Sequence, residues 1–255
     1  MSLSERAAAT WYETFEVGSY WADMSGVASP FALLQMMQDV AWKHAQALRF
    51  GYSDLGARNQ FWVLSRLSMH VNRYPQWGET VRLESWTSGT SRLFALRDFR
   101  LYDDDEKELM KSVTAWLVVD QETRRPIRPE RIVSELSSPS MPSQFQNAPE
   151  KLAPVEWEAE RPLQYDTRIR YSDIDPQGHA NNTRYVSLML DGLDAEWHRT
   201  HWLRRLTVNF VKECTAEDSV RVVGRIDNDT QQSVHSVTRI EDGSVAAALS
   251  ADWSS

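Results

Sequence analysis

Hydrophobic positions along this chain form one helical stripe followed by a series of alternating runs. Between residues 33 and 48, apolar side chains recur every three or four positions, which predicts an amphipathic helix with one buried face. The stripe consists of Leu33, Met36, Met37, Val40, Ala41, Ala47 and Leu48, and His44 falls on the same face. We interpret His44 as a hydrogen-bonded core histidine. A helix of this kind needs a sheet against which to bury its apolar face.

Short alternating runs separated by polar turns predict strands in both halves of the chain. They cover residues 80–87, 94–102 and 111–119 in the first half, and 220–226, 235–240 and 245–253 in the second. One further strand precedes each helical segment, at residues 12–17 and 165–171. A helix followed by an antiparallel sheet that wraps it predicts an α+β fold.

The two halves share one sequence pattern, which indicates a duplicated unit. Asp23 and Gly26 stand opposite Asp175 and Gly178 at a constant offset, and the run from residue 66 alternates like the run from residue 205. The first half carries about a dozen extra residues after its helix, at 49–61, which we interpret as a loop that shapes a pocket. Between the halves, residues 134–163 are rich in Ser, Pro and Glu and predict a linker. The predicted domains are therefore 1–133 and 164–255.

Composition and charge narrow the functional classes. A net charge of −8 over 255 residues opposes binding to nucleic acid. The sequence contains no run of 18 apolar residues, which a membrane-spanning helix would need. A single cysteine and the lack of a signal-peptide pattern predict a cytoplasmic protein. Local basic groups would suit either an acidic partner or a solvated surface: Arg124, Arg125, Arg128, Arg131, Arg199, Arg204 and Arg205.

The most specific motif is YSDIDPQGHANNTRYV from Tyr171, which is followed by LTVNFVKECTAEDSV from Leu206. Together with WVLSRLSMHVNRYPQWGETVRLESW from Trp62, RDFRLYD from Arg97 and VDQETRRPIR from Val119, this sequence resembles the plant and bacterial acyl-ACP thioesterases, where ACP is acyl carrier protein. The resemblance covers nearly the whole chain. It implies two tandem hotdog domains, each a long helix wrapped by an antiparallel β-sheet.

The resemblance also implies an activity and a partner. Members of the family hydrolyse the thioester of fatty acyl-ACP to free fatty acid and ACP, in fatty acid biosynthesis. The expected partner is therefore ACP with its acyl-phosphopantetheine, and no cofactor is expected. Neither a metal-ligand spacing nor a G-x-S-x-G motif occurs in the sequence.

The family's functional residues are an Asp, an Asn and a His in this turn, with a Glu and a Cys on the strand after the helix. Asp175, His179, Glu213 and Cys214 match four of these positions, and Gln177 stands where the family has Asn. In the interpretation we favour, Glu213 activates a water, His179 positions water or substrate, and Asp175 orients the turn. A nucleophilic Cys214 with His179 as its base stays open. Structural roles are also open: an Asx turn for Asp175 and a small buried hydrophobe for Cys214.

Thioester hydrolysis also needs donors for the oxyanion. The turn leads into a helix predicted to begin near Asn181 or Asn182, where backbone N–H groups carry positive partial charge. A thioester carbonyl is expected to rest against Gly178, His179 or Ala180. Asn181 and Asn182 are included as substrate-binding candidates, although either one alternatively caps the helix.

The first half lacks the candidate catalytic residues. Val27, Tyr74 and Pro75 stand there at the positions of His179, Glu213 and Cys214. We expect it to contribute the acyl-binding wall and the second half to carry catalysis. Candidates for the wall are Met36, Met37, Val40, Trp42, Phe61 and Trp62, although plain core is the favoured role for each one taken alone.

Three other functions remain open at this stage: an acyl-CoA thioesterase, a noncatalytic acyl-binding protein and, with less support, a dehydratase. The duplicated chain already supplies paired domains, so the protein is expected to be a monomer or a homodimer.

Overall fold

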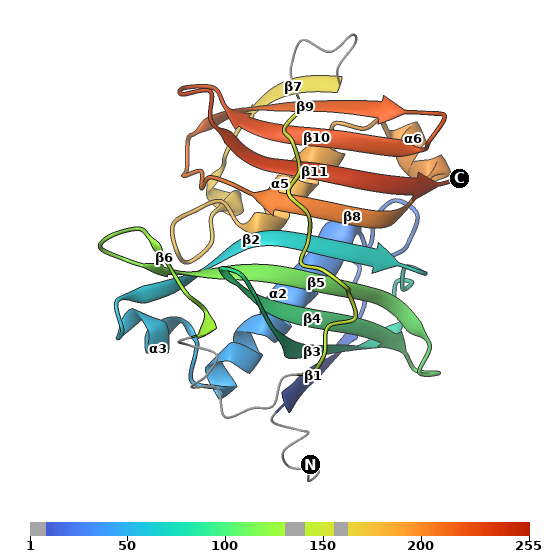
Figure 1. Ribbon diagram of the computed structural model, residues 1–255. Helices are drawn as coiled ribbons and strands as arrows, with labels where there is room; N and C mark the ends of the chain where they lie inside the picture. The colour runs from blue at the N-terminus through green and yellow to red at the C-terminus, as the bar shows by residue number, and fades with distance from the viewer. Residues whose placement is uncertain (1–8, 131–140, 156–162) are drawn as a thin grey trace. The chain divides into compact units, whose positions relative to one another are not determined.

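The computed structural model describes residues 9–130, 141–155 and 163–255, and the chain divides into two compact units, Met1–Pro149 and Glu150–Ser255 (Figure 1). The boundary between the units falls inside the predicted linker, 134–163. Residues 134–140 and 156–162 of that linker lie outside the described part of the chain.

The first unit is a helix on an antiparallel sheet, in which the strand order is β1-β3-β4-β5-β2 and β6 pairs with β5. Helix α2 lies along one face of this sheet (Figure 1). The elements of the unit are β1 (Thr10–Glu16), α2 (Pro30–Ala47), α3 (Tyr52–Gly56), β2 (Gln60–Val71), β3 (Thr80–Ser91), β4 (Phe94–Asp103), β5 (Glu108–Asp120) and β6 (Pro126–Ile127).

Helix α2 begins where the sequence supplies both a cap and a helix-starting residue. The Ser29 side chain accepts a hydrogen bond from the Ala32 N–H at 3.3 Å, and Pro30 occupies the first turn, where no N–H is needed. The predicted apolar stripe is buried as far as His44, whereas Ala47 is exposed and Leu48 is half-buried where the helix ends. His44 is 1% exposed, and its Nδ1 lies 2.8 Å from Nη1 of Arg97 on β4, which confirms it as a hydrogen-bonded core histidine.

The opposite face of the first sheet is covered in part by the described portion of the linker. Asp98 follows Arg97 on β4 and therefore points away from α2. Its carboxylate accepts hydrogen bonds from the Gln144 N–H at 2.8 Å and from the Ser143 hydroxyl at 3.0 Å. Burial raises the pKa of Asp98, while these hydrogen bonds favour its ionised form. This part of the linker is thus fastened to the sheet.

Residues 49–61 differ from the predicted loop, because they form α3 and the start of β2. Asp54 closes the short helix by accepting a hydrogen bond from the Gly51 N–H at 2.9 Å. Leu55 is fully buried and packs in a small cluster with Phe50 and Val118. This local burial orders a segment that, by its composition, resembled a loop.

The second unit repeats the plan with the strand order β8-β11-β10-β9-β7. Its elements are β7 (Leu163–Arg168), the 3-10 turn η1 (Tyr171–Asp173), α5 (Asn182–Leu190), α6 (Ala195–Thr200), β8 (Trp202–Phe210), β9 (Ser219–Asp227), β10 (Gln232–Arg239) and β11 (Val245–Ser254). The helical segment is divided, because α5 ends at Leu190 and Asp194 caps a new helix by accepting from the Trp197 N–H at 2.7 Å. Each unit is a helix packed on an antiparallel sheet, so the predicted α+β fold with two tandem hotdog domains is confirmed.

Asn181, and not Asn182, caps α5, and this assignment predicts a difference in stability. The Asn181 side chain accepts from the Thr183 N–H at 2.9 Å, while Asn182 is the first helical residue. We expect Asn181→Ala to lower the free energy of unfolding by about 1 kcal/mol. Asn182→Ala is the matched control and should change it much less. Denaturant titration of both variants tests the assignment, which equal losses would contradict.

Buried His235 on β10 predicts a loss of stability in acid. Its side chain is 1% exposed and, among the described residues, its Nδ1 has no hydrogen-bond partner. Burial lowers the pKa of His235 from 6.5 to about 4. Below about pH 6.5, the unfolded chain therefore takes up a proton that the folded chain excludes.

This contribution to stability is complete above the unfolded pKa and is lost as the pH falls toward the folded pKa. The expected loss is on the order of 3 kcal/mol between about pH 6.5 and pH 4. The free energy of unfolding, measured by urea titration across this range, should fall more steeply for wild type than for His235→Gln. Parallel curves for the two proteins would rule out His235 as the source.

Candidate active site

The turn that precedes α5 is closed by Asp175. Its side chain accepts a hydrogen bond from the Gln177 N–H at 2.8 Å, and its carbonyl accepts from the Gly178 N–H at 2.9 Å. The Asp175 N–H donates to the His179 carbonyl, also at 2.9 Å. Gly178 has a φ of 84°, a conformation in which a residue with a Cβ would be strained. This arrangement fixes where His179 leaves the turn.

The first unit contains the same turn without the histidine. Asp23 accepts from the Ser25 N–H at 2.8 Å through its side chain and from the Gly26 N–H at 3.0 Å through its carbonyl. Gly26 has a φ of 74°, and the Asp23 N–H donates to the Val27 carbonyl at 2.8 Å. The Asx turn is therefore a feature of both halves, and His179 in place of Val27 is what distinguishes the second.

A backbone hydrogen bond joins each turn to the loop after the next strand. The Ala180 N–H donates to the Cys214 carbonyl at 2.8 Å, and the Ala28 N–H donates to the Pro75 carbonyl at 2.8 Å. The alignment that pairs Cys214 with Pro75 thus has a direct structural counterpart. In the second unit, this bond brings the turn beside the loop that carries Glu213.

Glu213 and Cys214 lie in a loop rather than on the strand where the sequence analysis placed them. The N–H groups of Val211 and Lys212 both donate to the Ala246 carbonyl, at 2.8 and 3.2 Å. Two residues facing one carbonyl break the alternating ladder, so β8 ends before this point. Leaving the strand allows the side chains of the loop to depart from strict alternation between the two faces.

The structure brings His179 and Glu213 together. His179 Nδ1 lies 3.2 Å from Glu213 Oε2, and the two side chains are 34% and 42% exposed. Both groups are thus within reach of solvent and of a bound molecule. An imidazole and a carboxylate at this distance form a pair that can exchange or direct a proton.

Cys214 occupies a different environment from its neighbour. It is fully buried, and burial raises the pKa of its thiol. Its backbone N–H donates to the Tyr185 hydroxyl of α5 at 2.9 Å. Because the thiolate is the nucleophilic form of cysteine, this environment opposes reactivity. Within the described residues, the side-chain contact of His179 is to Glu213 and not to Cys214.

Of the three backbone donors considered for a thioester carbonyl, two are already used. Gly178 donates to Asp175 and Ala180 donates to Cys214. The N–H of His179 donates to no group in the described part of the chain. It is therefore the donor of this set that is free to donate a hydrogen bond to a carbonyl oxygen.

The remaining predicted site residues lie close to His179 in the chain. Asn181 caps α5 through its side chain, and Asn182 is the first residue of the helix. Gln177 is exposed, and its side-chain amide makes no hydrogen bond to any described residue. The turn therefore uses the backbone of Gln177 and leaves its amide facing solvent.

Asp173, which was not among the predicted site residues, braces this site. Its carboxylate is 5% exposed and accepts from Arg184 Nε at 2.8 Å and from the Arg170 N–H at 2.7 Å. The Asp173 carbonyl accepts from the Asn181 N–H at 2.8 Å. One residue thus ties together both ends of the turn and the first part of α5. The signal in the sequence was a second Asp two positions before Asp175 with an Arg entering the helix.

No group of three or more His, Cys, Asp or Glu side chains in the described residues is arranged to hold a metal ion. Among the helices of that same part of the chain, none has the length and apolar character needed to cross a membrane.

Comparison with known proteins identifies the family of the chain. Residues 8–138 match the family model for the acyl-ACP thioesterase N-terminal domain, and residues 157–255 match the model for the C-terminal domain. A crystal structure of an acyl-ACP thioesterase from Bacteroides thetaiotaomicron superposes with a TM-score of 0.84 at 25% identity, covering 100% of both chains. The 12:0-ACP thioesterase from Umbellularia californica has the same fold, with a TM-score of 0.86 at 22% identity over 96% of this chain and 97% of that one.

Curated relatives similar in sequence belong to the same family as these structures. A chloroplastic acyl-[acyl-carrier-protein] hydrolase of Cuphea viscosissima is 26% identical over 94% of this chain. A chloroplastic oleoyl-acyl carrier protein thioesterase of Arabidopsis thaliana is 27% identical over 82% of it. The chain spans only 60% and 61% of the length of these two relatives. The two domain models together cover most of the sequence, and the chain therefore belongs to the acyl-ACP thioesterase family.

Proposed function

We propose that this protein hydrolyses the thioester of fatty acyl-ACP, releasing free fatty acid and ACP in fatty acid biosynthesis. The observation that carries the proposal is the contact of 3.2 Å between His179 and Glu213, in a chain of the acyl-ACP thioesterase family. The comparisons supply the reaction class, and the geometry supplies residues that suit it.

In this proposal, Glu213 is the base for the attacking water. The carboxylate takes a proton as the water oxygen bonds to the carbonyl carbon, and the carbon–sulfur bond then breaks as the sulfur leaves and is protonated. His179 contacts Glu213 through Nδ1, so its Nε2 is available to orient water or the thioester. The backbone N–H of His179, two residues before the N-cap of α5, stabilises the oxyanion. Asp175 acts by fixing the turn.

A nucleophilic Cys214 is the less favoured mechanism. The thiol is buried, its pKa is raised, and His179 contacts Glu213 instead. A catalytic cysteine needs a nearby base and a lowered pKa, and Cys214 meets neither condition. Its place in the site is better explained by its backbone, which joins the loop to the turn and to Tyr185.

We further propose that domain 1–133 contributes the acyl-binding wall while domain 164–255 carries catalysis. Met36, Met37 and Val40 are buried in α2, so an acyl chain would need to reach between this helix and its sheet. Trp42 is 53% exposed and lies away from that core. The side chain of Trp62 donates to the Phe50 carbonyl at 2.9 Å, which makes it part of the domain framework.

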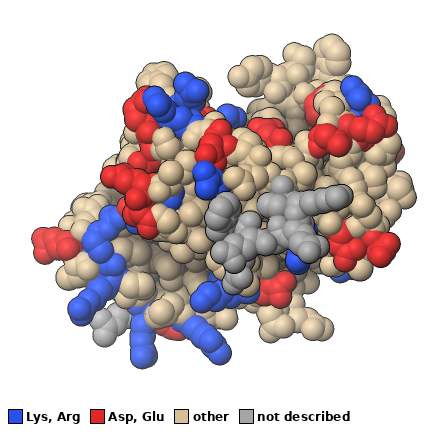
Figure 2. Space-filling model, turned by 90° about the horizontal axis from the view of Figure 1, so that it is seen from above, with Lys and Arg blue, Asp and Glu red and all other residues tan. Residues whose placement is uncertain are grey.

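The carrier is proposed to be ACP, and acyl-CoA remains the alternative. Acidic and basic side chains are interspersed on the face drawn in Figure 2, so basic groups are available to an acidic carrier protein despite the net charge of −8. Tight acyl binding without thiol release would favour the noncatalytic alternative. A cytoplasmic location and a monomeric or homodimeric state stay predictions, and the curated relatives named above are chloroplastic.

Thiol release from medium- and long-chain acyl-ACP, and from the matching acyl-CoAs, tests the function and the base together. We expect Glu213→Gln to lower kcat by roughly a hundredfold or more, while Cys214→Ser keeps most of the activity. A faster reaction with acyl-ACP than with acyl-CoA would identify the carrier. If Cys214→Ser lost activity and Glu213→Gln kept it, the nucleophile would be Cys214. If folded wild type released no thiol, the proposal that the protein is a thioesterase would be rejected.

The raised pKa of Cys214 yields a separate test by pH. If the thiolate were the nucleophile, kcat would climb with pH through the alkaline range, because a raised pKa moves ionisation to higher pH. We expect no such climb, and we expect the pH profile of kcat to have the same shape in wild type and in Cys214→Ser. Steady-state kinetics between about pH 6 and pH 10 measure both profiles. A rising limb that disappears in the serine variant would reject the carboxylate mechanism.

A further inference from the structure

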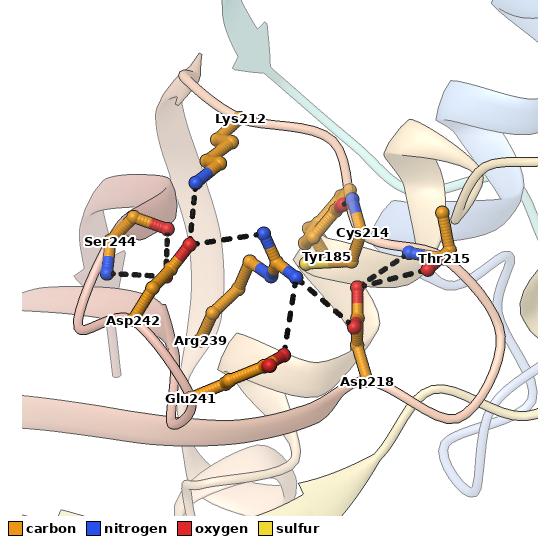
Figure 3. Close-up of polar contacts among 9 residues, drawn as sticks. All are labelled: Tyr185, Lys212, Cys214, Thr215, Asp218, Arg239, Glu241, Asp242 and Ser244. Atoms are coloured by element: carbon orange, nitrogen blue, oxygen red, sulfur yellow. Dashed lines mark hydrogen bonds and ion pairs between the residues drawn. The ribbon is translucent and has the colours of Figure 1, made fainter.

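Salt bridges and hydrogen bonds hold the loop of Glu213 and Cys214 on both of its sides (Figure 3). Before the pair, Lys212 Nζ lies 2.6 Å from Asp242 Oδ2 in the turn between β10 and β11. After the pair, the Thr215 N–H donates to Asp218 Oδ2 at 2.7 Å. Glu213 and Cys214 therefore lie between two residues, Lys212 and Thr215, that polar contacts hold in place.

Arg239 connects the two anchors into one frame. Its Nη1 lies 3.2 Å from Asp242 Oδ2, and its Nη2 lies 3.2 Å from Asp218 Oδ1. The side chains of Arg239 and Asp218 are 18% and 14% exposed. This inner pair is shielded from solvent more than the outer pair of Lys212 and Asp242, whose exposures are 43% and 39%. A half-exposed ion pair adds little to global stability, so its influence is mainly on the local position of the loop.

The first unit has a similar frame, in which the counterparts of Lys212, Thr215, Asp218 and Asp242 lie 139 positions earlier in the chain. Arg100, at the position of Arg239, contacts Gln144 and Glu108 instead, and Arg73 alone joins the two acidic residues. Arg73 stands in the place of Lys212, and its Nη2 lies 3.0 Å from Asp103 and 2.6 Å from Glu79. Gln76, in the place of Thr215, donates through its N–H to Glu79 at 2.9 Å. The frame is common to both halves, but in the first it encloses a Tyr and a Pro and in the second a Glu and a Cys.

Fixing these loops has different consequences in the two units. In the first, the enclosed residues carry no base. In the second, the loop presents Glu213, whose Oε2 meets His179 at 3.2 Å. A carboxylate displaced by even about 1 Å loses much of its effect as a base, because proton transfer depends steeply on geometry.

We propose that Lys212 and Asp242 are positioning residues, which fix the Glu213 loop and so hold the Glu213 carboxylate against His179. This inference rests on the proposed function, because it assigns the frame a task in the same reaction. Asp242 is the key member, since its Oδ2 receives both Lys212 and Arg239 while its Oδ1 accepts from the Ser244 N–H at 3.0 Å.

Asp242→Asn tests the proposal with Asp103→Asn as its matched control. Asparagine keeps an oxygen for the turn hydrogen bond and removes the charge in both cases. Lys212→Met removes the outer ion pair, while Lys212→Arg substitutes the residue that the first unit has at this position. All four variants are compared with wild type in kcat, KM and midpoint of thermal unfolding.

A second measurement needs no turnover. The chain has one cysteine, and Cys214 is fully buried within the framed loop, so the rate of its modification by a soluble disulfide reagent under native conditions reports opening of this loop. We expect Asp242→Asn and Lys212→Met to raise that rate several-fold, and Asp103→Asn to leave it unchanged. The same two variants should lower kcat roughly tenfold with little change in KM. Lys212→Arg should restore most of what Lys212→Met loses.

Equal labelling rates and equal kcat in Asp242→Asn and Asp103→Asn would overturn the positioning role. A loss in Lys212→Met that Lys212→Arg does not restore would overturn it as well. Failure of the proposed function is distinguishable from either result, because it is seen as the absence of thiol release by wild type itself, whereas the labelling rates are read independently of activity.

Discussion

The backbone hydrogen bond from Ala180 to the Cys214 carbonyl is the constraint on which the candidate site depends. It joins two segments that are far apart in sequence, the Asx turn before α5 and the loop after β8. Together with the hydrogen bond from the Cys214 N–H to the Tyr185 hydroxyl of α5, it holds the segment of the imidazole beside the segment of the carboxylate. The matching bond from Ala28 to Pro75 shows that the connection belongs to the fold of each unit and not to the chemistry of one.

The duplicated architecture separates framework from function. Both units keep the Asp-Gly turn, the turn-to-loop hydrogen bond and an ionic frame around the loop. They differ in the residues that this framework presents, where Val27 and Tyr74 of the first unit correspond to His179 and Glu213 of the second. Polar residues that hold the framework therefore say little about chemistry by themselves. The informative residues are those that differ between two otherwise equivalent positions.

Burial explains why the adjacent residues Glu213 and Cys214 differ so much in the roles open to them. The loop turns the glutamate side chain outward, where it is 42% exposed and meets His179. The same loop turns the cysteine inward, where burial raises its pKa. A buried thiol costs little to accommodate as a small apolar group, whereas a buried carboxylate without partners would cost several kcal/mol. The direction of each side chain thus follows from its solvation as well as from the backbone.

The sequence by itself determined the first helix and most of its buried face, the succession of strands along the chain, the duplication and the family, because these depend on local periodicity and on motifs contiguous in the chain. It also identified the turn residues and the pair Glu213 and Cys214 as candidate site residues. Tertiary structure alone decided that Asn181 rather than Asn182 caps the helix, that residues 49–61 are ordered, and that the reactive pair lies in a loop. It also decided that His179 meets Glu213 and that Asp173 braces the turn through Arg184. The cap is a contact between near neighbours, Asn181 and Thr183, and two adjacent asparagines leave the choice undecided in the sequence. The other features depend on contacts between separate segments of the chain and on which side chains lose contact with water, and no local pattern encodes either quantity.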